Sequence, residues 1–288
     1  MINEIKVSIS YVTYNHSKYI RRAIDSFLSQ KILFNYEILI TDDASTDGSK
    51  KIIEEYQKIY PEIIKPKFNI VNQFRKESQS HQANFIRAKG KYIALCDGDD
   101  FWIDINKLDK QIKAMEQLDA DVSFHSVEIL NPYNSNRKIK KPSLKKKFYT
   151  TNEIIWHAHK LYTSVVSTVI KTTIAKNLPI FYNFAPTEDH YLLILGSLKN
   201  GALFLPDCMA CYDFKTDNSW SVKTPNLSRH HMENLITFFK LFFYIKKNYS
   251  IKFLIIVKII ELFMKSILLK NNTINKIVVK RNLNYLIS

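Results

Sequence analysis

The sequence predicts an α/β protein, in which a mostly parallel sheet has helices on both faces and is followed by a C-terminal helical extension. Strand-like and helix-like segments alternate over the first 130 residues, which is the pattern of crossover connections between parallel strands. The chain has 288 residues, 46% of them hydrophobic and 13% aromatic, which is enough for a sizeable core. From Pro225 onward, long apolar and basic segments replace the alternation.

The expected strands of the first part are short apolar or β-branched runs bounded by polar residues. They span residues 6–12, 36–40, 68–71, 92–96 and 121–129. Helical spacing of apolar residues predicts helices between them, at residues 17–30, 45–60, 85–89 and 106–118. Ser45 or Thr46 can cap the second of these helices, and Pro61 stops it.

The second half of the chain predicts fewer regular elements. Residues 131–151 are polar and basic and predict a loop. Strands are expected at 163–171 and 202–205, a helix at 189–198, and basic amphipathic helices at 235–247 and 251–270. We therefore expect one domain over residues 1–224, with halves at about 1–130 and 131–224, and a helical extension over 225–288.

The net charge is +15, and much of the excess lies in residues 137–147 and in the tail from Lys240. Either these lysines form a solvated surface, or they attract an anionic partner such as a membrane, a nucleotide or a polyanion. No run of about 18 uncharged apolar residues occurs in the sequence, and its first residues do not resemble a signal peptide. We expect a cytoplasmic protein with reduced thiols.

Polar residues follow three of the expected strands, at 13–15 (TYN), 41–48 (TDDASTDG) and 97–100 (DGDD). In a parallel sheet these ends share one edge, which is where ligands bind. Crowded carboxylates raise one another's pKa unless a cation lies among them, and aspartate oxygens suit Mg²⁺ or Mn²⁺. The structural alternative is that the acids at 42, 43 and 47 cap a turn and the next helix, and we favour it for Asp47.

The chain has only five glycines and contains neither G-x-G-x-x-G nor a P-loop motif. A glycine-rich phosphate cradle is therefore not expected. Any bound nucleotide would be held through carboxylates and a metal ion.

Three segments resemble the successive signatures of family 2 glycosyltransferases. They are SISYVTYNHSKYIRRAIDSFLSQ, YEILITDDASTDGS and AKGKYIALCDGDDFW, in the family's order and spacing. The resemblance covers residues 5–130 and continues in part to about 221. It implies a GT-A fold, an inverting mechanism, a nucleotide-sugar donor bound by the half at 1–130, and Mn²⁺ or Mg²⁺.

The resemblance also implies roles for residues of the first two strand ends. Val12, Thr13 and Tyr14 would lie along the nucleobase. Asp43 matches the acidic residue that binds the base, commonly uracil, so a UDP-sugar is the expected donor.

At the third strand end, Asp97 and Asp99 match the D-x-D pair of the family. Asp99 would hold the metal that bridges the diphosphate. Asp97 would face the ribose and would also contact this metal. Asp100 and Trp102 match supporting positions that follow the motif. The sequence departs from the family upstream, because the usual Ala-Arg-Asn before Lys-Gly is not readable in SHQANFIRAKG.

An inverting transfer also needs a base that removes the proton of the acceptor hydroxyl. Asp189, in the segment TEDH, matches the catalytic base of the family, and Glu188 is a supporting acid. The alternative role of this pair is to stabilise the N-terminus of the helix expected at 189–198.

A second departure lies in YDFKTDNSWS, where many members have Tyr-Arg-x-His and this chain places Asp213 and Lys215. Lys215 is expected to offer positive charge to the donor diphosphate, and Trp220 to line the acceptor side.

The expected function is the transfer of a sugar to a hydroxyl of a glycan or lipid-linked acceptor in surface-polysaccharide synthesis. Two alternatives remain: a nucleotidyltransferase that makes a nucleotide-sugar, and a basic nucleic-acid binder. The first usually has a glycine-rich basic loop after strand one, and the second a basic sheet edge. Neither pattern is present, and no nucleic-acid partner is expected.

The C-terminal helices have two interpretations. Their apolar faces and flanking lysines suit peripheral contact of residues 235–270 with the anionic inner face of the cell membrane. Alternatively, the same faces pack in a homodimer.

Overall fold

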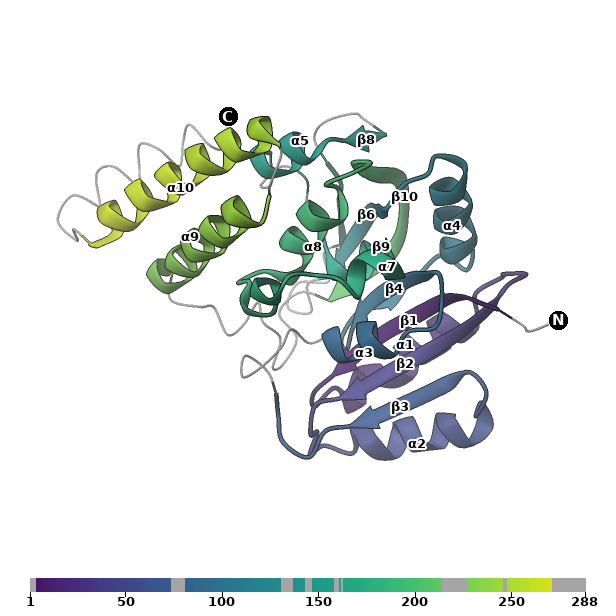
Figure 1. Cartoon of the computed structure of the whole chain (residues 1–288). Coiled ribbons are helices and arrows are strands. Elements are labelled where there is room, and N and C mark those ends of the chain that lie inside the picture. The colour runs from purple at the N-terminus through teal and green to yellow at the C-terminus, as the bar shows by residue number, and fades with distance from the viewer. Residues whose placement is uncertain are drawn as a thin grey trace. The chain divides into compact units, whose positions relative to one another are not determined.

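The computed structural model describes residues 4–73, 81–130, 137–142, 147–157, 161, 163–213, 227–245 and 248–270 (Figure 1). The chain divides into two compact units, Met1–Lys223 and Thr224–Ser288, and each is described by itself.

The first unit is built on a ten-stranded sheet. Eight of its strands follow the order β3-β2-β1-β4-β9-β6-β10-β5, and the other two, β7 and β8, pair with β6 and β10. The strands are β1 Ile5–Thr13, β2 Asn35–Asp42, β3 Ile64–Phe68, β4 Tyr92–Asp97, β5 Phe101–Trp102, β6 Val122–Leu130, β7 Arg137–Lys140, β8 Phe148–Tyr149, β9 Val169–Lys171 and β10 Ala202–Asp213. β1 pairs in parallel with β2 and β4, β2 with β3, and β6 with β10. The short strands β5, β7, β8 and β9 pair antiparallel. The expected mostly parallel sheet therefore holds for its long strands.

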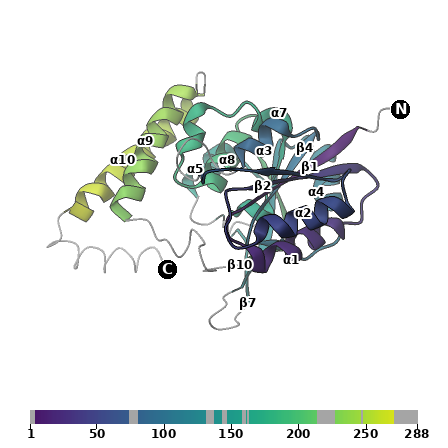
Figure 2. The ribbon, with the colours of Figure 1, turned by 90° about the horizontal axis from the view of Figure 1, so that it is seen from below.

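Helices cover both faces of this sheet (Figure 2). They are α1 Ser17–Leu28, α2 Ser49–Ile59, α3 Gln82–Arg87, α4 Lys107–Gln117, α5 Thr151–Trp156, α7 Thr172–Ala175 and α8 Glu188–Gly196. Figure 2 shows α1, α2 and α4 on one face, and α3, α7 and α8 on the other. α1 forms because its apolar residues Ile20, Ala23, Ile24 and Phe27 repeat at helical spacing and are all buried.

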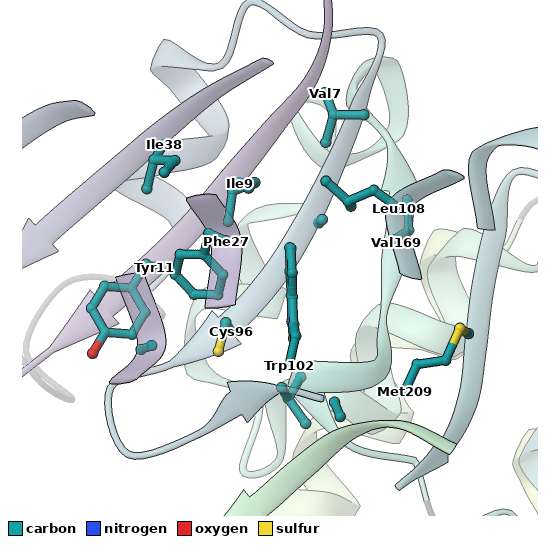
Figure 3. Close-up of a cluster of buried hydrophobic side chains, with 14 of the residues drawn as sticks. Val7, Ile9, Tyr11, Phe27, Ile38, Cys96, Trp102, Leu108, Val169 and Met209 are labelled. Atoms are coloured by element: carbon teal, nitrogen blue, oxygen red, sulfur yellow. The ribbon is translucent and has the colours of Figure 1, made fainter. Parts of the chain in front are cut away.

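The core under α1 and α4 draws side chains from most of the sheet (Figure 3). Its labelled members are Val7, Ile9 and Tyr11 of β1, Ile38 of β2, Cys96 of β4, Trp102 of β5, Val169 of β9, Met209 of β10, Phe27 of α1 and Leu108 of α4. Alternate residues of β1 face this apolar side, so Ser8 and Ser10 point to the opposite face, where they are also fully buried.

Two strand predictions are corrected by the structure. The third strand lies at Ile64–Phe68 instead of 68–71, because Ile64 is fully buried whereas Ile70 is 97% exposed. The strand expected at 163–171 is regular only over Val169–Lys171, after a 3₁₀ turn at Val165–Ser167. The hydroxyls of Ser167 and Thr168 both donate to the Ser164 carbonyl, and such local bonds compete with strand pairing.

The segment expected to be a loop at 131–151 holds β7 and β8, and it leads into α5, which begins with a capping box between Thr150 and Glu153. β10 is longer than the strand expected at 202–205. It continues beyond Pro206 because its register against β6 shifts between Leu205 and Cys208.

The second unit contains α9 Leu227–Tyr244 and α10 Tyr249–Lys270. The two helices contact each other. Among their residues, Leu235, Phe238, Leu241, Ile251 and Ile255 are buried. Within the described residues, no helix combines the length and the apolar character that crossing a membrane requires.

Candidate functional site

The carboxyl ends of β1, β2 and β4 lie side by side, as expected from a parallel arrangement. The register aligns Val12 with Thr41 on β2 and with Asp97 on β4, and it aligns Thr13 with Asp42. The loops TYNHS, TDDASTDG and DGDD therefore leave the sheet at one edge. This edge is the candidate site.

The first two loops are bonded to each other. The backbone N–H of Asn15 donates to Ser45 Oγ at 2.8 Å, and the Thr46 N–H donates to Asn15 Oδ1 at 2.8 Å. Asn15 and Ala44 have positive φ angles of 56° and 64°, which are tight-turn conformations that non-glycine residues rarely adopt. The bonds between the loops hold both turns in place.

Asp47 has the capping role that the sequence favoured for it. Its carboxylate accepts from the Ser17 N–H at 2.8 Å, where α1 begins, and from the Ser49 N–H and hydroxyl, where α2 begins. Burial raises the pKa of Asp47, but the bonds from Ser49 and Ser17 outweigh burial and lower this pKa to about 2.

Asp43 lies in a nearly covered position beside the end of β3. Its Oδ1 accepts from Asn69 Nδ2 and from the Gln73 N–H, both at 2.8 Å. Neighbouring Asp42 accepts from the Ser45 N–H, and burial raises its pKa against the opposing bonds from Ser45. Thus Asp43 faces the segment 69–73, whereas Asp42 holds its own turn.

The residues expected along the nucleobase are packed against the third loop. Val12 and Thr13 are buried and Tyr14 is half-buried. A Cβ atom at position 98 would collide with the His16 ring and would approach Thr13 Oγ1 to 2.9 Å. Glycine at 98 therefore allows the end of β1 to touch the DGDD turn, and it brings His16, which the sequence did not single out, to the site.

The DGDD turn is fixed through its backbone. The Tyr11 hydroxyl donates to the Gly98 carbonyl at 2.8 Å, and Arg22 Nη2 donates to the Asp99 carbonyl at 2.9 Å. Asp100 Oδ1 accepts from the Asp213 N–H at 3.0 Å. Burial, and then the charges of Asp99 and Asp97, hold the pKa of Asp100 well above its usual range. Asp100 thus lies under the turn, whereas the Asp97 side chain is 40% exposed.

Trp102 also lies under the turn, in the core instead of at the surface of the site. Its ring meets Phe27 edge-on at 4.6 Å between centroids. The ammonium of Lys107, a fully buried residue, lies 4.3 Å from the Trp102 ring centroid and 2.7 Å from Gln111 Oε1. Burial lowers the pKa of Lys107 to about 7. Trp102 therefore supports the turn by packing.

Asp213, where the chain departs from the family pattern, forms an ion pair in the structure. Its Oδ2 accepts from Arg22 Nη2 at 2.8 Å, and the Arg22 guanidinium carbon lies 4.0 Å from the Phe101 ring centroid. Asp213 thus ties the end of β10 to α1 and to the DGDD turn. Lys215 and Trp220, expected at the diphosphate and the acceptor, lie outside the described residues.

Glu188 and Asp189 begin α8, and both are half-buried. Glu188 accepts from the Tyr182 hydroxyl at 3.0 Å, and Asp189 accepts from the Thr163 hydroxyl at 3.3 Å. Burial raises the pKa of Glu188 to about 7 and that of Asp189 to about 6, and the charge of Asp97 adds to both rises. Burial is thus the main reason that both acids at the start of α8 have raised pKa values, and Asp97 of the DGDD turn has a smaller effect on each.

His81 is a site residue that sequence reasoning missed. Its Nε2 lies 3.0 Å from Asp97 Oδ1, and its Nδ1 lies 2.7 Å from Ser10 Oγ. The only available signal was the segment SHQAN, which the sequence showed merely as a departure from the family.

Asp97 and Asp99 are the residues that could hold a divalent metal. No group of three or more His, Cys, Asp or Glu side chains is arranged as a metal site in the part of the chain that the structure describes. Mg²⁺-type ions need only one or two carboxylates when waters and substrate phosphates complete the shell. The two aspartates, all-oxygen donors with one side chain reaching solvent, fit that requirement.

The family model "Glycosyl transferase family 2" matches residues 8–175. The chain belongs to this family. An uncharacterized protein of Mycobacterium tuberculosis is 30% identical over 230 residues, which cover 74% of this chain and 60% of that protein. This glycosyltransferase thus spans about three fifths of the length of its mycobacterial relative. The Escherichia coli β-1,3-glucosyltransferase WfgD is 26% identical over 220 residues, covering 76% of this chain and 80% of WfgD.

Solved structures show the same fold. Staphylococcus aureus TarS in complex with UDP-GlcNAc matches with a TM-score of 0.69 and 16% identity, over 91% of this glycosyltransferase and 73% of that chain. The mannosyltransferase PcManGT of Pyrobaculum calidifontis, in complex with GDP-Man and Mn²⁺, matches with a TM-score of 0.63 and 15% identity, over 88% and 69%. The fold is GT-A, and the family is one of glycosyltransferases.

Proposed function

We propose that this enzyme transfers a sugar from a UDP-sugar to a hydroxyl of a glycan or lipid-linked acceptor, with inversion at the anomeric carbon. The observation that carries the proposal is the coupling of two acidic groups from distant parts of the chain. Asp97 lies at the end of β4. Burial raises the pKa of Asp189 at the start of α8 to about 6, and the charge of Asp97 adds a smaller rise. A donor site and a base on opposite sides of one sugar are what an in-line displacement needs.

In this proposal the donor lies along the shared edge of β1, β2 and β4. Val12, Thr13 and Tyr14 line the nucleobase, and Asp43 accepts from a base N–H. Asn69 and Gln73 already donate to Asp43, so its carboxylate is oriented before a ligand binds. Lys215 is proposed to offer positive charge to the diphosphate.

Asp97 and Asp99 are proposed to hold Mn²⁺ or Mg²⁺, which would supply positive charge to the leaving diphosphate. Asp97 also faces the ribose. Asp100 and Trp102 support this corner from below, through the Asp213 N–H and the core.

Asp189 is proposed to act as the base, with Glu188 beside it and Trp220 lining the acceptor side. It takes the proton of the acceptor hydroxyl while the acceptor oxygen bonds to the anomeric carbon and the bond from that carbon to the diphosphate oxygen breaks. A pKa of about 6 leaves Asp189 ionised at neutral pH yet more basic than an ordinary aspartate.

The relatives support the finer parts of this proposal. The name of WfgD states a UDP-Glc donor, a β-linkage and a diphosphoundecaprenol-linked acceptor. TarS was crystallised with UDP-GlcNAc, and PcManGT with GDP-Man and Mn²⁺. We therefore place the enzyme in the synthesis of a surface polysaccharide, where such acceptors occur.

A thermal-shift panel of UDP-, GDP-, dTDP- and CMP-sugars, each with and without Mn²⁺, tests the proposal. UDP-sugars with Mn²⁺ should raise the melting temperature most, since ligand binding stabilises the folded state. Asp43→Ala should remove this shift. The matched control is Asp109→Ala, which deletes an acid that pairs with Lys113 on the outside of α4. If no nucleotide-sugar shifts the wild type, or if both variants respond alike, the proposal fails.

We also propose that the second unit binds an anionic membrane surface. Met232, Ile236, Phe239 and Phe243 form an exposed stripe along α9, and Tyr249, Phe253, Ile256 and Ile260 form one along α10. Each stripe repeats at helical spacing on a helix that already buries another face. Residues 225–288 contain eleven Lys and Arg and two Glu, a formal charge of +9. This charge favours an anionic lipid surface over a second copy of the same basic unit.

A further inference from the structure

A buried layer of polar side chains lies between α3 and the strands β1 and β2. Ser8, Ser10, His81 and Asn84 are fully buried, and Glu37 is nearly so. β1 is therefore covered on both faces, but only the face toward α1 is apolar. Polar groups at such depth are costly unless each has a hydrogen-bond partner, so the arrangement of partners defines this layer.

The side-chain amide of Asn84 forms hydrogen bonds through both its nitrogen and its oxygen. Its Nδ2 donates to Ser10 Oγ at 3.0 Å and to the carbonyls of Tyr11 and Leu39 at 3.2 and 3.0 Å. Its Oδ1 accepts from the Thr41 hydroxyl at 2.7 Å and from Arg87 Nη2 at 2.8 Å. Bonds in so many directions leave the amide a single orientation.

A line of hydrogen bonds runs from Asn84 to the site. Ser10 Oγ receives the Asn84 bond and lies 2.7 Å from His81 Nδ1, while His81 Nε2 lies 3.0 Å from Asp97 Oδ1. An ionised carboxylate only accepts hydrogen bonds, so Nε2 must carry a proton. The Ser10 hydroxyl proton can then point to Nδ1. With a neutral ring, every bond runs from Asn84 through Ser10 and His81 to Asp97. With a doubly protonated ring, Nδ1 donates to Ser10 instead, and Nε2 still donates to Asp97.

We infer that His81 is a positioning residue, which fixes the carboxylate of Asp97 in the orientation that the donor and the metal require. The imidazole engages Oδ1 of a side chain that is otherwise 40% exposed, and Oδ2 remains for the ligand. Partners of this kind orient metal-binding side chains, and their loss costs roughly 10–100-fold in affinity or activity. The inference rests on the proposed function, because the role of Asp97 is part of that proposal.

The test is the affinity of the full-length protein for UDP in the presence of MnCl₂, measured by calorimetry, which does not depend on turnover. His81→Gln should raise the Kd roughly tenfold or more. Ser10→Ala keeps the imidazole but removes the bond that orients it, so it should raise the Kd by a smaller factor. Melting temperatures are recorded for every variant.

His125→Gln is the matched control. His125 is also fully buried in the sheet, on β6, and its Nδ1 contacts the Ser126 carbonyl at 2.7 Å instead of an acid. Like His81→Gln, the His125→Gln variant should have a lower melting temperature than the wild type. It should nevertheless bind UDP and Mn²⁺ with wild-type affinity. An equal loss of affinity in both histidine variants would overturn the inference, and so would wild-type affinity in His81→Gln. If His81→Gln does not fold, wild-type affinity for UDP in Ser10→Ala would overturn the inference.

Asp97→Asn separates this inference from the proposed function. If Asp97→Asn binds like the wild type, the proposed site itself is wrong. If Asp97→Asn loses affinity and the His81 and Ser10 variants do not, the site stands and only the positioning role is lost.

Discussion

The aspartates of the turn after β4 are close neighbours, yet each has a different environment. Asp97 is half exposed and contacts His81. Asp99 is nearly covered, and its carbonyl is held by Arg22. Asp100 is fully buried, its carboxyl accepts the Asp213 N–H, and its pKa lies well above the usual range. Burial and the charges of its neighbours favour the neutral form of Asp100, which reduces the mutual repulsion of these acids.

Asp99→Ala is expected to reduce metal-dependent turnover by roughly 100-fold or more, since it removes a proposed metal ligand at the leaving group. The fold should persist, because the hydrogen bond from Arg22 uses the backbone carbonyl of residue 99. Product formation over a Mn²⁺ titration and the circular dichroism spectrum measure the two effects. Asp109→Ala is the control, and wild-type turnover in Asp99→Ala would refute the metal assignment.

Asp189 gives a prediction for the pH dependence. Burial raises its pKa to about 6, and a general base acts only when it is deprotonated. The rate should therefore rise as pH increases through about 6 and level off above it. Asp189→Asn should bind the donor normally and lose transfer together with this pH dependence.

A kcat profile between pH 5 and 8, with calorimetric binding of UDP, measures both properties of Asp189. A rate that stays constant down to pH 5 would contradict its role as the base. An active Asp189→Asn enzyme would place the base elsewhere.

At the scale of elements, one ion pair joins three parts of the first unit. Arg22 on α1 donates to the Asp99 carbonyl in the turn after β4 and to Asp213 at the end of β10. The backbone of Asp213 donates in return to Asp100. These bonds therefore connect α1, the turn after β4 and the end of β10 to one another beside the site.

A double-mutant cycle of Arg22→Gln and Asp213→Asn should show a coupling of about 0.5–1 kcal/mol in the free energy of unfolding. The value is modest because the Arg22 side chain is 36% exposed and solvent screens the pair. Urea denaturation measures it. The Arg21–Glu55 pair, also anchored on α1 but more exposed, is the control and should show no measurable coupling. Strictly additive effects of the Arg22 and Asp213 substitutions on the free energy of unfolding would show that this ion pair does not stabilise the fold.

At the scale of the whole molecule, the charge is divided unequally between the two units. The second unit carries +9 of the +15 and displays apolar stripes on both of its helices. The first unit displays its acids at the sheet edge, where they would repel an anionic surface. On the membrane proposal, we therefore expect the second unit, rather than the acidic sheet edge of the first, to contact an anionic surface.

Binding to vesicles tests that division. The full-length protein should sediment with vesicles rich in phosphatidylglycerol, and less with pure phosphatidylcholine or at high salt, because screening weakens the attraction of lysines to the lipid. Phe243→Ser combined with Phe253→Ser should lower sedimentation. Ile59→Ser, which removes an exposed apolar residue from α2, is the control. A variant that instead dissociates a dimer in analytical ultracentrifugation would assign the stripes to self-association.

Features that depend on local pattern could be predicted from the amino-acid sequence. The apolar runs of β1, β2 and β4 and the helical spacing of α1 and α4 gave the α/β class, because periodicity reports which side of an element is buried. The acids at 43, 97 and 99 follow these runs directly, so a parallel sheet brings them to one edge. The position of β3 and the 3₁₀ turn before β9 were not predicted. Burial decides where β3 lies, and local hydrogen bonds from hydroxyl groups favour the turn.

The residues that support the site from distant parts of the chain could be identified only in the folded protein. Arg22 and Asp213 are 191 residues apart in the chain, and Ser10 and His81 are 71 apart. Neither pair has a periodicity or spacing that marks it, because each forms only after the sheet order brings its elements together. The same holds for the start of α8, whose coupling to Asp97 appears only in the folded chain. Local pattern therefore fixes which acids stand at the sheet edge, and long-range pairing decides how those acids are held and charged.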